Sequence, residues 1–360
     1  MSSNSTEINA FIERIPLFEK NEYEWKLFYG SNKNKNVRLV YMGEIKNNQN
    51  NIENNYEKTL FVKEFVIKNN KLELLLKEVF FNYSLQSQNF FPKDIRILLS
   101  IDNNYLFLVF KGDNISLDKL IKSKKFDYRK VGSYTKWIIY QITFALYILH
   151  ENKIIHHDIK PENILISQKG NISIIDFGSA FFKGGKTDSY TLYYSSPDYL
   201  INNDSNSDDE KYDMWSLGVV ILELYLKQVT IFRKKEIESN NEFEMSESQK
   251  KEEKTKFLFS KFGVKDYSSE EELNNFKLDK EILSQIEDKD IKDLIMHLLV
   301  FNPNQRYSAK EILKLPFFSE FKDEFPFDLD PIEYPFGKEE ISNNNIDSQK
   351  FLELINTMKG

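Results

Sequence analysis

Four polar residues in one central stretch have the types and the spacing to act on a phosphate group. Lys160 follows Asp158 by two positions, Asn163 follows it by five, and a second acid, Asp176, comes shortly afterwards in IIDFGSA. Carboxylate and amide oxygens suit hard divalent cations, and Mg²⁺ prefers one or two carboxylates together with substrate phosphates. We therefore predict that Asn163 and Asp176 bind Mg²⁺. Asp158 would orient an attacking hydroxyl and accept its proton, and Lys160 would neutralise charge on the transferred phosphoryl group.

Apolar segments on both sides of these residues must hold them in place. The stretch IIHHDIKPENILI, Ile154–Ile166, places the polar residues between two apolar runs, and NISIID is predicted to form a second short strand after it. The segment before it, YTKWIIYQITFALYILHEN, is predicted to be a helix with a core-facing stripe: Ile138, Ile142, Ala145 and Leu149. Loop residues that rigid elements position in this way are common catalytic groups.

The bulk composition excludes several classes of protein. The 360 residues, 41% hydrophobic and 29% charged, are enough for one large domain or for two lobes that share a cleft. The net charge of -7 argues against nucleic-acid binding through bulk charge, and the lack of cysteine excludes disulfides and thiolate metal sites. The longest apolar segment, MWSLGVVILELYL, is too short to span a bilayer and contains Glu223. We expect no nucleic-acid or membrane partner and a cytoplasmic location, with the nucleus or a cytoskeletal assembly such as a cilium as alternatives.

The element pattern divides the chain into a β-rich part and a helical part. Residues 24–110 are predicted to form strands with one helix, 111–114 a junction, and 115–318 a mostly helical part with a charged insertion near 228–256. Residues 1–23 are an N-terminal extension, and 319–360 are a C-terminal tail in which aromatic and acidic residues alternate. Because exposed aromatic side chains are unfavourable in water, we expect this tail to pack on the domain or on a partner.

An ordered series of motifs resembles the eukaryotic protein kinase family. HHDIKPEN followed by DFG is similar to the catalytic and metal-binding loops of that family, and FVKEF is similar to its third-strand lysine motif. TLYYSSPDYL, YDMWSLG and LLVFNPNQRYSAKEILKLPFF follow in the family's order. The likeness covers roughly residues 24–318. Its specificity lies in the order of the whole series, which chance is very unlikely to produce.

The resemblance implies a bilobal protein-kinase-like fold of the α+β class, with ATP and Mg²⁺ between a β-rich lobe and a mostly helical lobe. Lys63 would reach the α- and β-phosphates while Glu78 holds it. Glu73 lies on the same predicted helix and is the alternative partner for Lys63. The other nucleotide-binding positions that the resemblance implies are Gly30, Val37, Phe110, Lys111, Asp113 and Leu165.

The same resemblance indicates the substrate and the supporting residues. DIKPEN is typical of Ser/Thr kinases, and Thr191 matches the threonine of their substrate loop. The motifs are most similar to the branch of cyclin-dependent, mitogen-activated and glycogen-synthase kinases. Ser195 stands where that branch has the arginine that favours proline-directed substrates. The implied partners are a protein substrate and a regulatory or scaffold protein. The implied structural residues are His156, Asp213 and the pair Arg306 and Asp198.

Three departures from the family pattern leave two functions open. His157 replaces the arginine that pairs with phosphate on the activation segment, and an imidazole lacks that bidentate geometry. Asn32 and Lys35 replace two glycines of the glycine-rich loop, and Phe61 replaces the small alanine that roofs the adenine. An active serine/threonine kinase is the first hypothesis. The second is a pseudokinase that serves as a scaffold or a structural subunit. A Phe61 ring in the adenine position would favour the second.

Overall fold

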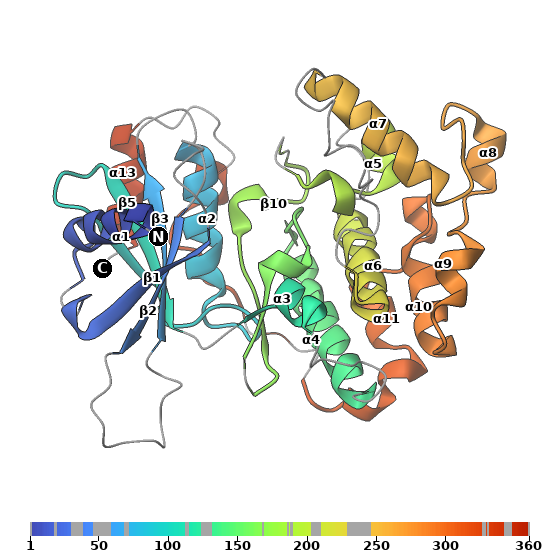
Figure 1. Cartoon of the computed structure of the whole chain (residues 1–360), viewed down its shortest axis with the longest axis horizontal. Coiled ribbons are helices and arrows are strands. Elements are labelled where there is room, and N and C mark those ends of the chain that lie inside the picture. Colours follow the sequence, from blue (N-terminus) through green and yellow to red (C-terminus); the bar gives the residue numbers. More distant parts are fainter. Residues whose placement is uncertain are drawn as a thin grey trace. The chain divides into compact units, whose positions relative to one another are not determined.

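The chain forms two compact units, which comprise Met1–Asn114, Ser167–Lys169 and Asp330–Gly360 in the first and Ile115–Ile166 and Gly170–Leu329 in the second. The computed structural model describes residues 2–17, 20–29, 39–45, 59–67, 72–111, 115–123, 132–167, 169–185, 187, 190–202, 210–228, 246–325, 329, 331–341 and 348–358. Figure 1 shows a sheet with helices in the first unit and a mostly helical second unit. The expected α+β division into a β-rich part and a mostly helical part is confirmed.

The described part of the first unit contains a five-stranded antiparallel sheet in the order β1-β2-β3-β5-β4. In β3 and β5 the register pairs Phe61 with Phe110 and Lys63 with Leu108. Successive side chains of a strand point to opposite faces, so Phe61 and Lys63 share one face and Leu60 and Val62 share the other. The strands are β1 (Tyr23–Tyr29), β2 (Leu39–Ile45), β3 (Thr59–Val66), β4 (Arg96–Leu99) and β5 (Tyr105–Lys111).

The N-terminal helix α1 (Ser2–Arg14) covers the Leu60 face of the sheet. The Phe11 ring stacks on Tyr41 with a centroid separation of 3.7 Å, and Arg14 is 2.7 Å from the Glu64 carboxylate. The buried core between helix and sheet consists of Phe11, Ile15, Leu17, Trp25, Tyr41, Leu60, Val62, Phe107 and Val109. The N-terminal extension is therefore part of the hydrophobic core of the first unit.

Helix α2 (Leu72–Leu85) is buried on almost every side. One side carries Glu78 and meets Lys63 of the sheet. The C-terminal helices α12 (Lys338–Ile341) and α13 (Ser348–Thr357) also contact α2. The expectation that the tail packs on the domain is confirmed for its described residues: 331–341 and 348–358 belong to the first unit, and Phe321 and Phe325 pack on α4 of the second unit.

The second unit is built around two buried helices, α4 (Gly132–Glu151) and α6 (Glu210–Leu226). The predicted stripe of α4 is fully buried, at Ile138, Ile142, Ala145 and Leu149. The remaining helices are α3 (Leu117–Lys122), α5 (Pro197–Asn202), α7 (Glu247–Ser260), α8 (Glu270–Asn274), α9 (Lys280–Ser284), α10 (Lys289–Leu298) and α11 (Ala309–Leu313).

Short strands of the second unit carry the polar loops. β6 (Ile115–Ser116), β8 (Ile164–Ile166) and β9 (Ile172–Ile174) pair in that order, and β7 (Ile154–Ile155) pairs with β10 (Phe181–Phe182). Asp158 thus follows β7, and Asp176 follows β9. Much of the predicted insertion lies outside the described residues, and its end forms α7, which begins with a Ser246 capping box. Among the described residues, no helix combines the length and hydropathy needed to span a membrane.

Candidate active site

The backbone of the loop after β7 is held by a buried carboxylate from α6. Asp213 accepts the backbone N–H groups of His156 and His157 at 2.9 and 2.8 Å. His150 Nε2 lies 3.0 Å from the same carboxylate. Burial alone would raise the pKa of Asp213, but the hydrogen bond and charge of His150 and the His156 contacts hold that pKa below its ordinary value. Asp213 is therefore an ionised anchor, in the structural role that the resemblance implied.

His156 joins this loop to the segment that carries Asp176. Its Nδ1 accepts the Asp158 backbone N–H at 3.3 Å, so its Nε2 is the nitrogen that donates to the Ile175 carbonyl, 3.1 Å away. The Ile175 N–H in turn donates to the Asn163 carbonyl at 3.0 Å. Asp176 follows with a left-handed backbone, φ 70°. These bonds keep Asp158, Asn163 and Asp176 in one local structure.

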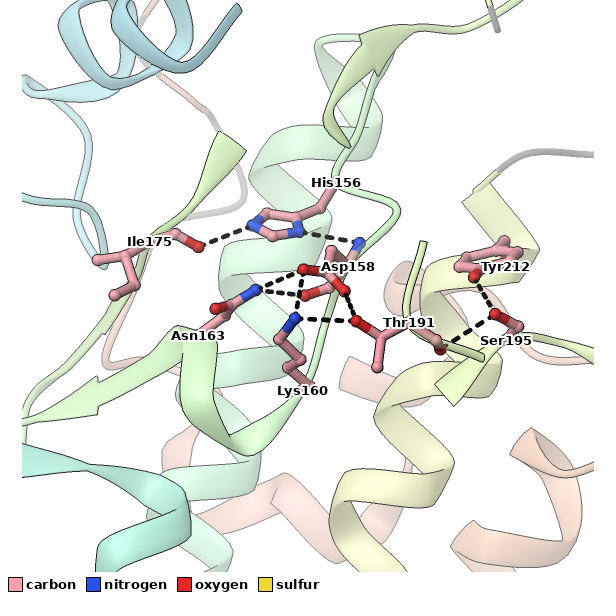
Figure 2. A network of polar contacts seen from close by, with 8 residues as sticks. All are labelled: His156, Asp158, Lys160, Asn163, Ile175, Thr191, Ser195 and Tyr212. Carbon is pink, nitrogen blue, oxygen red and sulfur yellow. Dashed lines mark hydrogen bonds and ion pairs between the residues drawn. The ribbon is translucent and has the colours of Figure 1, made fainter. Parts of the chain in front are cut away.

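The Asp158 carboxylate is the centre of a closed polar cluster (Figure 2). Lys160 Nζ donates to Asp158 Oδ2 at 2.6 Å and to Thr191 Oγ1 at 2.9 Å, and the Thr191 hydroxyl donates to Asp158 Oδ1 at 2.6 Å. Asn163 Nδ2 donates to the Asp158 carbonyl at 2.8 Å and to Oδ2 at 3.0 Å. The amide nitrogen of Asn163 thus faces Asp158, and its oxygen points away. The carboxylate already accepts an alcohol hydrogen bond of the kind that a substrate hydroxyl would make.

Charge balance keeps Lys160 protonated in this cluster. Burial opposes its charge, but the carboxylates of Asp158, Asp176 and Glu162 outweigh burial and raise the pKa of Lys160 above its ordinary value. Asp158 and Asp176 therefore both lie close enough to Lys160 for their charges to raise its pKa. A fixed ammonium beside a carboxylate and a hydroxyl is suited to stabilise negative charge on a phosphoryl oxygen.

A chain of two hydroxyl groups, from Tyr212 and Ser195, holds the backbone carbonyl of Thr191. Tyr212 donates to Ser195 Oγ at 2.7 Å, and Ser195 Oγ donates to the Thr191 carbonyl at 3.1 Å (Figure 2). Burial raises the pKa of Tyr212 well above its ordinary value, so its hydroxyl stays a neutral donor. From the sequence, Ser195 is notable only for the arginine that it replaces. The YSS sequence beside Thr191 holds hydroxyl groups that could have indicated such a chain.

His157 lies among aromatic rings. It stacks on Tyr212 with a centroid separation of 3.9 Å, and Tyr199 and Phe181 lie 5.0 and 5.4 Å away. The residue is buried and its φ is 63°. The sequence identified the missing arginine, but it could not show that rings from α5, α6 and β10 surround the histidine. The closing ion pair implied by the family is present at 2.7 Å between Arg306 and Asp198.

In the first unit, the structure chooses between the two candidate partners of Lys63. Its Nζ lies 2.6 Å from Glu78 Oε1, and both side chains are buried. Glu73 instead pairs with Lys77 one helical turn later, at 2.5 Å. The geometry therefore favours Glu78, and the role of the pair in nucleotide binding stays a prediction.

The face of β3 that carries Lys63 also carries a bulky aromatic pair. Phe61 is 2% exposed, and its ring stacks on that of Phe110 at 5.8 Å with an interplanar angle of 16°. The two benzyl groups form a buried apolar pair, and Phe61 precedes Lys63 by two residues on the same face of β3.

The remaining predicted nucleotide-binding residues are only partly described. Leu165 is buried in β8, opposite Ser116 of β6 and Ser173 of β9. Lys111 ends β5, opposite Leu60, and its side chain is outside the described part of the structure. Gly30, Val37 and Asp113 lie outside the described residues. Their proposed contacts with nucleotide stay predictions.

Comparison with known proteins supports the order of motifs. Residues 46–318 match the protein kinase domain. The CTD kinase subunit alpha of Saccharomyces cerevisiae is 28% identical over 238 residues, which are 62% of this chain and 43% of that protein. Calcium-dependent protein kinase 4 of Plasmodium berghei and that of Plasmodium falciparum are each 33% identical over 224 residues, 59% of this chain and 35% of theirs. The chain thus covers less than half the length of these relatives. With more than half of its residues matched, it belongs to the protein kinase domain family.

Proposed function

We propose that the protein is an ATP-dependent serine/threonine kinase that transfers the γ-phosphoryl group to a hydroxyl of a protein substrate. The observation that carries this proposal is the Thr191 hydroxyl held at 2.6 Å by Asp158 and at 2.9 Å by Lys160. A substrate hydroxyl bound in the same way would lose its proton to the carboxylate, and the ammonium would neutralise the charge that develops on the phosphoryl group.

The residues that the sequence assigned to the metal fit Mg²⁺. Bound Mg²⁺ would supply positive charge that neutralises the phosphates. The amide oxygen of Asn163 is directed away from Asp158 and could bind a cation. Asp176 adds a carboxylate, whose negative charge also raises the pKa of Lys160. Among the described residues, no cluster of three His, Asp or Glu side chains could hold a metal. Nucleotide phosphates would therefore complete the ligand set, which is the usual arrangement for Mg²⁺.

The nucleotide site requires both units. We assign residues 24–110 to the small lobe, 111–114 to the hinge and 115–318 to the large lobe. In this assignment Lys63 binds the α- and β-phosphates, and Gly30, Val37, Phe110, Lys111, Asp113 and Leu165 surround the base and sugar. The proposal requires Lys63 and the Asp158 cluster to act on the same nucleotide.

Partners and branch are assigned on weaker grounds. The TLYYSSPD and LLVFNPNQR motifs support the branch of cyclin-dependent, mitogen-activated and glycogen-synthase kinases. One relative is named as a kinase subunit, which supports a regulatory or scaffold partner for this chain as well. Cytoplasm is the proposed location, with the nucleus or a cytoskeletal assembly such as a cilium as alternatives.

The stacked pair of Phe61 and Phe110 supports a second candidate, a pseudokinase that acts as a scaffold. Where the family has an alanine methyl group over the adenine, this chain has a buried benzyl group stacked on Phe110. A base would have to displace that ring or bind beside it. In a scaffold, the hydrogen bonds around Asp158 would stabilise the fold and would not take part in catalysis.

A nucleotide titration distinguishes the two candidates. Thermal unfolding of the full chain is followed with increasing ATP in excess Mg²⁺, and saturation at tens of times the Kd should stabilise a kinase by roughly 2 kcal/mol or more. Phosphate transfer to a serine- and threonine-containing protein mixture should then occur with wild type and be lost in Asp158→Asn. The absence of any shift at millimolar nucleotide would support the scaffold.

A further inference from the structure

The C-terminal tail lies beyond the part of the chain that matches the protein kinase domain, yet it packs on the helix that carries Glu78. The match ends at residue 318, and the described tail residues 331–341 and 348–358 belong to the first unit. Both α12 and α13 contact α2. The helix whose position decides the Lys63–Glu78 ion pair is therefore covered by the chain's own terminus.

Aromatic contacts show which face of α2 the tail covers. Phe80 follows Glu78 by two positions, which places the two side chains about 200° apart around a helix. The Phe80 ring lies 4.9 Å from Phe336 and is stacked on Tyr334 at 5.6 Å. The tail thus contacts the face of α2 opposite Glu78, so α2 lies between the sheet on one side and the tail on the other.

Helix α13 provides a second point of attachment. Its buried residues are Phe351, Leu354 and Ile355, which have the spacing of one face of a helix, and Met358 directly after the helix is buried as well. Lys350 of α13 lies 3.1 Å from Glu340 of α12, which ties the two tail helices together. The two tail helices are therefore joined to each other, present a buried apolar face and both contact α2.

The sequence of α2 requires such a partner. Leu75, Leu76, Val79, Phe80 and Phe81 are all buried, so apolar residues occupy most of the circumference of this helix. Apolar side chains spread this widely around a helix need cover on more than one side, and a single sheet face can cover only part of them. The tail supplies cover at Phe80.

We propose that residues 331–341 and 348–358 form an intramolecular clamp that holds α2 where Glu78 reaches Lys63, and that Tyr334 and Phe336 are positioning residues for this ion pair. The face of α2 opposite Glu78 is occupied by Tyr334 and Phe336 of the chain's own tail. Only the expected effect of the clamp on nucleotide binding rests on the proposed kinase function. Its effect on the ion pair can be measured without nucleotide.

The first test uses full-length Phe336→Ala and measures how fast Lys63 is acetylated, by peptide mass spectrometry under native conditions. Lys63 is buried and ion-paired, so opening of α2 should raise its labelling rate on the order of tenfold. Glu78→Gln is the positive control because it removes the partner directly. Phe321→Ala is the matched control: its ring packs on Trp137 and Tyr140 of α4. It should leave the Lys63 rate unchanged.

A double variant separates positioning from general stabilisation. If the tail acts through Glu78, Phe336→Ala should add nothing to the Lys63 labelling rate in a Glu78→Gln background, whereas independent effects would multiply. Phe336→Leu should restore most of the wild-type rate, since it keeps apolar volume. Tyr334→Ala is the milder variant if Phe336→Ala does not fold.

The outcomes of these tests are distinguishable from failure of the proposed function. An unchanged Lys63 rate in both Phe336→Ala and Tyr334→Ala would overturn the clamp, even if the tail helices exchange their amides faster. A wild type that binds no Mg-ATP would overturn the kinase while the labelling result still decides the clamp. If both stand, Phe336→Ala should weaken Mg-ATP binding by a factor similar to its effect on the labelling rate.

Discussion

The loop around Asp158 and the strand around Lys63 differ in what their neighbours provide. In the loop, hydrogen bonds connect the Asp158 carboxylate with Lys160, Asn163 and Thr191. The loop backbone is in turn held by the carboxylate of Asp213. In the strand, Lys63 has its carboxylate partner, but the residue two positions earlier adds an aromatic ring to the same face. The polar groups that handle phosphate and the shape that admits a base are therefore separate properties of the fold. A chain can keep the first while the second changes.

Loss of the Asp213 anchor should have the largest effect. Asp213→Ala removes a buried acceptor of two backbone N–H groups and leaves His150 without its carboxylate. Breaking such a buried charged site costs about 3–5 kcal/mol, and chemical denaturation measures it. Phosphate transfer should be lost with it. Asp293→Ala, on an exposed face of α10, is the control and should change the unfolding free energy by less than about 0.5 kcal/mol.

The same anchor gives a pH signature. The pKa of Asp213 is lower in the folded chain than its ordinary value. Its stabilising contribution is therefore complete above about pH 4, the ordinary pKa of an aspartate, and is lost as the pH falls through the lowered folded value. The stability gap between wild type and Asp213→Asn should be constant near neutral pH and shrink below that limit. A gap that widens on acidification would contradict the assignment.

Phe61→Ala tests the strand side of the comparison. The substitution should lower the unfolding free energy by about 3–5 kcal/mol, as for other buried aromatic residues. Phe107→Ala removes a buried ring from β5 on the opposite face of the sheet, away from Lys63, and is the control. If Phe61 limits the space for adenine, Mg-ATP should bind on the order of tenfold more tightly to Phe61→Ala alone, which corresponds to about 1.4 kcal/mol.

Equal affinities in the two variants would mean that the ring at position 61 does not limit access of the base. Isothermal titration measures both. This result would remove the main support for the scaffold function, provided that wild type also binds nucleotide.

Removal of the Thr191 hydroxyl should have an intermediate effect. Thr191→Val keeps the shape but removes the group that bonds to both Asp158 and Lys160. A hydrogen bond to a charged group contributes about 1.5–3 kcal/mol, so kcat/KM should fall roughly 10- to 100-fold. Thr191→Ser keeps the hydroxyl and should retain most of the activity. If valine and wild type have equal kcat/KM for the peptide substrate, Thr191 does not organise the catalytic groups.

The parts of the molecule that the sequence predicted are those with local or ordered signals. The stripe of α4 follows from its period, and the position of Asp158 between β7 and β8 follows from apolar runs around a polar loop. The sequence favours Glu78 over Glu73 as the partner of Lys63 but does not decide between them, because both lie on one helix and only the sheet determines which one faces Lys63.

Contacts between distant segments were the parts that the sequence did not reveal. Helix α1 was treated as an extension, although Ile8, Phe11, Ile12 and Ile15 have helical spacing that could have indicated its buried face. The tail was expected to pack somewhere, but no pattern named α2 as its site. Packing partners depend on the shape of both surfaces, and a single chain's periodicity describes only one of them.

His157→Arg should have the smallest effect on stability and tests whether the family's arginine suits this chain. The histidine is stacked on Tyr212 with Tyr199 and Phe181 around it. A larger guanidinium would overfill this space, which typically costs 1–3 kcal/mol. Stacking of the guanidinium on Tyr212 should keep the loss near the lower end, at about 1–2 kcal/mol.

His157→Phe, which keeps a ring in the same place, should cost less than the arginine. Neither variant should make phosphate transfer depend on prior treatment with a phosphatase, because the Tyr212–Ser195–Thr191 chain orders the substrate loop without a phosphate. An arginine variant that is as stable as wild type, and whose activity falls after phosphatase treatment, would mean that the aromatic cluster does not replace the family's phosphate-binding arginine.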